Sequence, residues 1–179
     1  MGGEPNSTVR VAILSDTHGY VCPDVLEIVQ GCDAAVHAGD IGGSKVLDLL
    51  DASVGSTHAV RGNNDVPGLW AGDELDMLKT LPWAAEIRLP GGTLAVEHGH
   101  IHGAMSPDHE KLRSAHPEAR VIVYGHTHKL LIDRSNSPWI INPGAAGRIR
   151  NQGGPSCLVL NAGPDCWDIE TFRFARLAG

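Results

Sequence analysis

Short apolar runs that stop abruptly at polar residues are the feature that most constrains the fold of this 179-residue chain. Runs 9–14, 34–38 and 57–60 are short and apolar, and they read as buried strands. Between them, segment 23–30 has apolar residues at helical spacing, and segment 44–51 is the other predicted helix. This alternation of strands and helices is typical of a parallel sheet with right-handed crossovers.

The rest of the chain is expected to form a second set of strands. A Pro-Gly-Gly turn joins two of them, and a closing hairpin ends the chain. The predicted strands cover residues 85–89, 93–97, 120–124, 129–133, 139–142, 157–161 and 165–174. Ser44 and Ser106 are expected to cap helices, and residues 73–79 are a candidate short helix. We therefore expect two mixed sheets packed face to face with helices outside.

Five of the predicted strands lead directly into side chains that bind metal ions. The candidate ligands are Asp16, His18, Asp40, Asn63, His98, His126 and His128. Ligands in open α/β sheets bind outside the carboxyl ends of strands, so these side chains are expected to converge. Oxygen and imidazole donors without thiolates suit Mn²⁺, Fe, Zn²⁺, Ni²⁺ or Co²⁺. Seven donors are too many for one ion but suit two ions that share a carboxylate. The alternative, ordinary capping and turn residues, does not explain why their order and spacing fit together.

The charge of the chain narrows the substrate classes. A formal net charge of −7 argues against a basic surface for nucleic acid, and 4% aromatic residues argue against a stacking platform for single strands. Two divalent ions would outweigh the charge of two aspartates. An acidic protein could therefore still attract a phosphate ester at this one place.

The ordered motifs resemble those of the calcineurin-like metallophosphoesterase family, and the YfcE-like phosphodiesterases are the most similar subgroup. The motifs are Asp16-x-His18, Gly39-Asp40, Gly62-Asn63-x-Asp65, His98-Gly-His100 and Gly125-His126-Thr-His128, with Asn142-Pro-Gly144 as a further turn. The resemblance implies a four-layer α/β/β/α sandwich, which agrees with the strand pattern. It also implies phosphoester hydrolysis.

The resemblance assigns the ligands to two ions. The first ion would be held by Asp16, His18, Asp40 and His128. The second would be held by Asp40, Asn63, His98 and His126, so Asp40 bridges the pair. A hydroxide shared by the two ions would attack phosphorus. Family resemblance favours Mn²⁺, with Zn²⁺, Ni²⁺ or Fe as alternatives.

One position departs from the pattern of many family members. Asn64 stands where they have a histidine that protonates the leaving group. An amide cannot act as a general acid at neutral pH, so we expect a phosphodiester with a good leaving group. His100 could serve as the acid or contact phosphate. Arg61 could meet phosphate or form a structural ion pair.

Other residues near the motifs are expected to have structural roles. Asp65 is expected to orient a ligand, and Trp70 to pack a loop down or form an oligomer contact rather than line a substrate cleft. His37 is expected to be a core histidine. Four more histidines are expected on the surface or in loops, namely His58, His102, His109 and His116.

Three alternatives stay open at the level of function. The chain could be a phosphomonoesterase or a nuclease of the same family, although the acidic charge disfavours the nuclease. It could also be a non-catalytic scaffold like the retromer subunit with this fold. The expected partner is a small phosphodiester substrate, nucleic acid is disfavoured, and a homo-oligomer is allowed.

The chain is expected to be one domain in the cytoplasm. Residues 1–8 read as a flexible tail without the apolar core of a signal peptide, and residues 9–179 as a single domain. Its apolar runs are shorter than the ~20 residues that a membrane helix needs. We therefore expect no membrane association.

Overall fold

Two five-stranded mixed sheets face each other in the computed structural model, which describes residues 7–148, 150 and 152–175. The first sheet has the strand order β10-β9-β1-β2-β3. Its strands are β1 (Val9–Leu14), β2 (Ala34–His37), β3 (Thr57–Ala59), β9 (Ser156–Ala162) and β10 (Trp167–Arg173). Of the predicted tail, residues 1–6 lie outside the described residues.

The second sheet has the order β4-β5-β6-β8-β7. Its strands are β4 (Ala84–Leu89), β5 (Gly92–Glu97), β6 (Val121–Val123), β7 (Leu130–Asp133) and β8 (Trp139–Pro143). In the first sheet β1, β2 and β3 are parallel, with the antiparallel hairpin β9-β10 beside β1. In the second sheet β5, β6 and β8 are parallel, with antiparallel β4 and β7 at the two edges. The two mixed sheets of the prediction are confirmed.

Strand β1 shows why its sequence is apolar almost throughout. Val11 and Ile13 point into the core between the two sheets, whereas Ala12 and Leu14 point into the core beneath the helices. Successive side chains of a strand alternate between its faces, so a strand covered on both faces must be apolar at every position.

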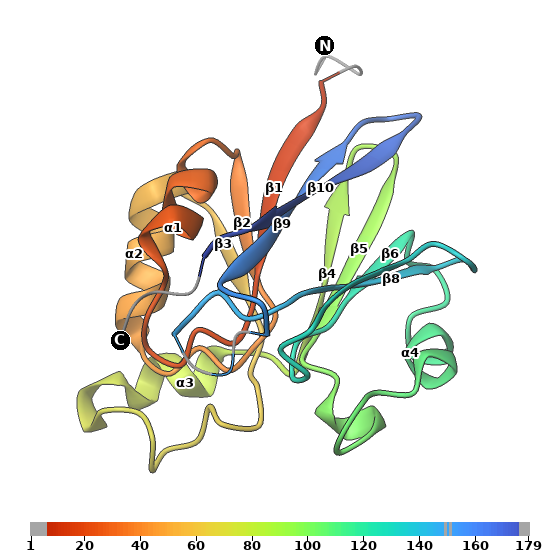
Figure 1. Ribbon diagram of the computed structural model, residues 1–179. Coiled ribbons are helices and arrows are strands. Elements are labelled where there is room, and N and C mark those ends of the chain that lie inside the picture. The colour runs from red at the N-terminus through yellow and green to blue at the C-terminus, as the bar shows by residue number, and fades with distance from the viewer. Residues whose placement is uncertain (1–6, 149, 151, 176–179) are drawn as a thin grey trace.

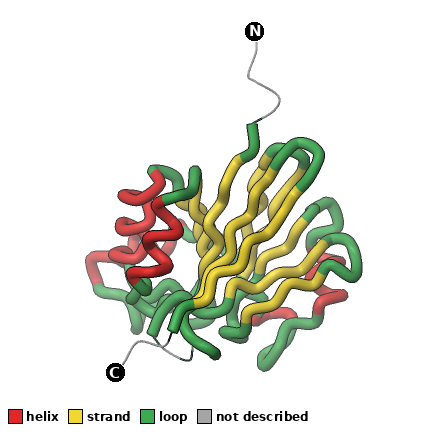
Figure 2. Tube along the Cα trace, turned by 45° about the horizontal axis from the view of Figure 1, so that its top comes forward, coloured by secondary structure: helices red, strands yellow, loops and turns green. Residues whose placement is uncertain are grey.

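The helices cover the outer faces of both sheets (Figures 1 and 2). The helices α1 (Pro23–Gln30) and α2 (Ser44–Val54) pack on the first sheet, and α4 (His109–Ala115) packs on the second. A short turn η1 (Gly72–Glu74) leads into α3 (Leu75–Thr80). The layers therefore follow the expected α/β/β/α order. No helix in the described part of the chain is long and apolar enough to cross a membrane.

The parallel strands bring their carboxyl ends to one edge of the sandwich. In the first sheet Leu14 pairs with His37, and His37 pairs with Ala59. In the second sheet Val96 pairs with Val123, which pairs with Ile141. The loops after these strands meet directly, since the amide of Gly125 donates to the carbonyl of His98 at 3.2 Å. This edge carries the candidate site.

Candidate metal centre

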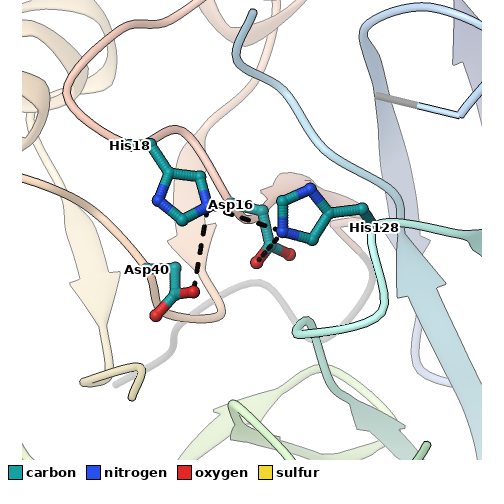
Figure 3. Close-up of side chains that lie close together, drawn as sticks. All are labelled: Asp16, His18, Asp40 and His128. Atoms are coloured by element: carbon teal, nitrogen blue, oxygen red, sulfur yellow. Dashed lines mark hydrogen bonds and ion pairs between the residues drawn. The ribbon is translucent and has the colours of Figure 1, made fainter. Parts of the chain in front are cut away.

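Four of the predicted ligands form one tight group at the strand ends (Figure 3). Donor atoms of Asp16, His18, Asp40 and His128 all lie within 4.8 Å of one another. Nε2 of His128 lies 3.2 Å from Oδ1 of Asp16 and 3.4 Å from Nε2 of His18. Nε2 of His18 lies 3.8 Å from Oδ2 of Asp40. Two carboxylates and two imidazoles around one point suit a divalent transition metal.

A second group adjoins the first through the other oxygen of Asp40. Nε2 of His98 lies 3.4 Å from Oδ1 of Asp40. Nδ1 of His126 lies 3.0 Å from Oδ1 of Asn63, and the rings of His98 and His126 are 5.3 Å apart. The two oxygens of Asp40 therefore face different groups of donors. The structure brings all seven predicted ligands to one edge of the sandwich.

Backbone carbonyls fix which ring nitrogens can bind a cation in the second group. Nδ1 of His98 lies 2.8 Å from the carbonyl of Ala38, and Nε2 of His126 lies 2.8 Å from the carbonyl of Ala104. A carbonyl only accepts, so these nitrogens donate, and in a neutral ring the other nitrogen keeps its lone pair. Those lone pairs face the Asp40 carboxylate and the Asn63 amide oxygen. Acceptors this close repel each other unless a proton or a cation lies between them.

Two buried polar atoms in the same place also lack a hydrogen bond. Oδ1 of Asp16 and Nε2 of His98 have no hydrogen-bond partner in the described part of the chain. Such buried groups are costly to leave unpaired, and bound ions are one explanation for them. The donor set therefore fits divalent metal ions.

Five of the seven predicted ligands have a strained backbone. Their φ angles lie between 47° and 65°, in the left-handed region, and the residues are Asp16, His18, Asp40, His126 and His128. This conformation costs an L-residue roughly 1–2 kcal/mol. Strain of this kind concentrates at functional sites, where the surrounding structure maintains it.

Glycines allow the ligand loops to approach one another. A Cβ on Gly62 would collide with the carboxylate and backbone of Asp40, and one on Gly125 would collide with Oγ of Ser15. Ser15 donates a short hydrogen bond to Oδ2 of Asp16. Both glycines are therefore required by close packing around the aspartates.

Asp65 organises the loops that carry Asp40 and Asn63. Its buried carboxylate accepts hydrogen bonds from the amides of Ile41, Gly42 and Gly62 and from the indole of Trp70. Trp70 is itself only 5% exposed, so it packs the loop down as expected. The hypothesis that Asp65 orients a ligand agrees with these contacts.

Asn64 holds Asp40 through two hydrogen bonds, which is a positioning role and not that of a general acid. Its backbone amide donates to Oδ1 of Asp40 at 2.9 Å, and its side-chain amide donates to Oδ2 at 2.7 Å. Asn64 therefore fixes the Asp40 carboxylate, whose two oxygens face the two donor groups. Asn142 has a similar role nearby, because its side-chain amide donates to the carbonyl of Gly125 at 2.7 Å.

Burial and neighbouring charged groups shift the pKa values of the predicted ligands. Burial works to raise the pKa of Asp40, but the neighbouring His98 imidazole and the hydrogen bonds from Asn64 outweigh it and hold this pKa well below its usual range. Burial works to lower the pKa of His98, but the carboxylates of Asp40 and Asp16 raise it above the ordinary value. Burial lowers the pKa of His18 despite the same two carboxylates. The Asp40 carboxylate is therefore ionised at neutral pH, which is the form that binds a cation.

The other two proposed catalytic residues lie beside the second donor group. His100 lies in the turn η2 (His100–His102), with its ring 5.6 Å from that of His98. Burial and the neighbouring His98 lower the pKa of His100. The guanidinium of Arg61 donates to the carbonyl of Asp65 at 3.0 Å and lies over the ring of Trp83. Sequence reasoning did not single out Trp83, and its apolar neighbours give no local signal for it.

The remaining histidines include one that is more buried than a surface position would be. His37 is fully buried and contacts Oγ1 of Thr17 at 2.9 Å, as expected for a core histidine. His116 lies in a loop directly after α4, one of the two expected places, but it is buried at 8% exposed, with Nε2 2.9 Å from Oε2 of Glu97. The buried carboxylate of Glu97 requires a partner, and His116 and His102 provide it.

The chain belongs to the calcineurin-like phosphoesterase superfamily. The family model of this domain matches residues 9–164, which span every motif of the site. Among curated proteins, the probable metallophosphoesterase MJ0623 of Methanocaldococcus jannaschii is 27% identical over 145 residues, covering 77% of this chain and 68% of the relative. The family expected from the motifs is therefore confirmed, and the chain is a phosphoesterase with a candidate metal site.

Solved structures with the same fold include enzymes and a sorting protein. YfcE, a phosphoesterase from E. coli, is 24% identical with a TM-score of 0.61, covering 84% of this chain and 87% of YfcE. An archaeal phosphodiesterase is 20% identical with a TM-score of 0.66, covering 91% of this chain and 99% of the other. Vps29 from Entamoeba histolytica, solved with Zn²⁺, is 17% identical with a TM-score of 0.68, covering 92% and 98%. These similarities show the fold.

Proposed function

We propose that this chain is a dinuclear metal-dependent phosphodiesterase acting on a small phosphodiester. The observation that carries the proposal is the position of Asp40, whose two oxygens face separate donor groups. In this proposal Asp16, His18 and His128 complete one ion site. Asn63, His98 and His126 complete the other. Mn²⁺ is the proposed metal, with Zn²⁺, Ni²⁺ or Fe as alternatives.

Two bound ions would supply Lewis acidity and a water of lowered pKa for attack on phosphorus. The residues of the chain position this chemistry. Asn64 fixes both oxygens of Asp40, and Asp65 fixes the backbone next to Asp40 and next to Asn63. The carbonyls of Ala38 and Ala104 orient His98 and His126, so that one nitrogen of each ring stays available to a cation.

The contacts of Asn64 favour a diester over a monoester. Its amide is engaged with Asp40 and carries no titratable proton at neutral pH. A missing general acid typically costs 10²–10⁴-fold for a poor leaving group, but little for a good one. We therefore propose substrates with good leaving groups, with His100 as the nearest candidate for contact with the phosphate or leaving group.

The test is hydrolysis of bis-p-nitrophenyl phosphate with added Mn²⁺, alongside the monoester p-nitrophenyl phosphate. We expect faster turnover of the diester, its loss on chelation, and its loss in Asp40→Ala. Asp76→Ala is the matched control, since its side chain is 95% exposed on α3. Two bound ions per chain by elemental analysis would support the dinuclear site. Faster monoester hydrolysis would contradict the diester proposal.

A scaffold is the second candidate, because Vps29 structures share this fold. The same assay separates the two, since a scaffold requires no turnover. Every ligand position of the motif carries a metal-binding side chain in this chain, which favours the enzyme. Absence of metal-dependent hydrolysis at every pH tested would favour the scaffold.

A further inference from the structure

Trp83 is a large aromatic side chain left exposed beside the candidate metal centre. It directly precedes β4 and is 52% exposed, whereas Trp70 and Trp167 are 5% and 2% exposed. Its chain neighbour Pro82 accepts a backbone hydrogen bond from Arg61 at 2.8 Å. Because Arg61 directly precedes the Gly62-Asn63 ligand loop, Trp83 is tied to the edge of the site.

His100 connects Trp83 to the ligands of the second donor group. The His100 ring lies 5.8 Å from the Trp83 ring, 5.6 Å from His98 and 6.2 Å from His126. Nδ1 of His100 is buried and has no hydrogen-bond partner within the described ranges. The indole of Trp83 is therefore one ring further out than His100 from the predicted ligands His98 and His126.

Arg61 holds the indole in place. Its guanidinium carbon lies 4.5 Å from the Trp83 ring centroid, while the same group donates to the carbonyl of Asp65. A cation over an aromatic face is attracted to it, and here the cation is itself anchored. A half-exposed ring already fixed in position loses little entropy when a ligand stacks on it.

The loop on the same side of the site carries no permanently charged side chain. Residues 100–105 contain no lysine or arginine, and Ile101 and Met105 are 71% and 90% exposed. The carbonyl of Ala104 in this loop accepts from His126, so the loop borders the second donor group. This loop therefore supplies apolar surface that suits an uncharged group, while the nearby cation, Arg61, is already engaged with Trp83 and the carbonyl of Asp65.

We propose that Trp83 binds a flat, uncharged aromatic group esterified to the phosphate of the substrate. The inference rests on the proposed function and adds the substrate class. The shared chemistry is an aromatic ring stacked on the indole, whether that ring is a nucleobase or a simple aryl group. Stacking of a base on an aromatic side chain contributes about 1–3 kcal/mol, or roughly 5- to 150-fold in affinity.

The experiment measures binding, so that it does not depend on turnover. Titration calorimetry of the full chain with Mn²⁺ compares methyl phosphate, phenyl phosphate and thymidine 5′-monophosphate. We expect at least one aromatic ligand to bind five- to 150-fold more tightly than methyl phosphate. The advantage should disappear in Trp83→Leu and persist in Trp83→Phe, which keeps a ring.

Trp139→Leu is the matched control, because Trp139 also lies under an arginine, with Arg134 4.9 Å from its ring, but at the opposite end of the parallel strands. It should keep the aromatic advantage. An advantage for phenyl phosphate alone indicates an aryl ester, and one for thymidine monophosphate alone indicates a nucleotide ester. Either result supports the proposal.

Equal affinities for all three ligands, no binding of any, or an advantage that survives in Trp83→Leu would overturn it. So would a change of oligomeric state in Trp83→Leu with unchanged affinities, which would make Trp83 a protein contact. If the aromatic advantage is present but no diester is hydrolysed, the proposed function fails while the aromatic subsite stands.

Discussion

Asp65 is the residue on which the loops of the site most depend. Its carboxylate accepts from three backbone amides and one indole, and of these bonds the one from Gly42 is partly buried and the others are buried. Asp65→Asn keeps the shape but places an N–H₂ group against those donors. We expect a loss of about 2–3 kcal/mol in the free energy of unfolding, because buried donors lose their acceptor. We also expect 10- to 100-fold weaker metal binding, since Asp65 supports the ligand loops.

Urea unfolding and metal titration measure the two effects. Asp76→Asn is the matched control, because Asp76 is exposed and pairs only with Lys79 on the surface of α3. It should leave both measurements close to those of the original protein. Equal behaviour of the two variants would show that Asp65 does not organise the site.

At the residue scale, the ligand types could be predicted because they directly follow recognisable strands. Their contacts could not, because they depend on residues distant in the chain. Asn64 illustrates this: the sequence shows an amide where many relatives have histidine, but not that this amide donates to Asp40, 24 positions away. The left-handed backbone of Asp16 and Asp40 was equally hidden, since nothing local requires it.

At the scale of elements, most strands and α1 could be predicted, but two helix starts were wrong. Ser44 is the first residue of α2, not its cap, and its amide and hydroxyl donate to the carboxylate of Glu74. Helix α4 begins at His109, capped by Asp108 instead of Ser106. In the first case the capping group comes from a distant segment. In the second, two neighbouring residues were both suitable caps.

The end of α4 is joined to the end of β5 by a buried ion pair that titrates. The hydrogen bond to Glu97 raises the pKa of His116 above 6.5. Burial works to raise the pKa of Glu97, but His116 and His102 lower it below 4.5. The His116 contribution to stability is complete below pH 6.5 and is lost as pH rises through the raised pKa. The Glu97 contribution is complete above pH 4.5 and is lost as pH falls.

His116→Gln should therefore lower the free energy of unfolding more at pH 5.5 than at pH 8. Urea unfolding at the two pH values gives the difference between variant and original protein, which removes the titration of every other group. His58→Gln is the control, because His58 is exposed on β3. A loss for His116→Gln that is equal at both pH values would contradict the ion pair.

At the scale of the whole molecule, the sequence indicated two sheets and the edge that carries the site, but not the order of the strands within each sheet. The strand β1 pairs with both β2 and β9, and β9 belongs to the closing hairpin at the far end of the sequence. The order β4-β5-β6-β8-β7 likewise depends on pairings between distant segments. What could be predicted is that ligands gather at carboxyl ends of parallel strands, because this holds for any order that makes those strands neighbours.

Because the predicted ligands come from loops of both sheets, metal binding is expected to stabilise the whole fold. Ions that bind the folded state alone stabilise it by about 2.7 kcal/mol at a concentration of 100 Kd. For a chain of this length that corresponds to a rise in Tm of about 5–10 °C on adding Mn²⁺, reversed by a chelator.

Asp40→Asn should abolish most of the rise, because Asp40 faces both donor groups, whereas His18→Ala and His126→Ala should each keep part of it. Thermal unfolding measures this, with His58→Ala as the control that keeps the full rise. An undiminished rise in Asp40→Asn would place the bound metal elsewhere on the protein.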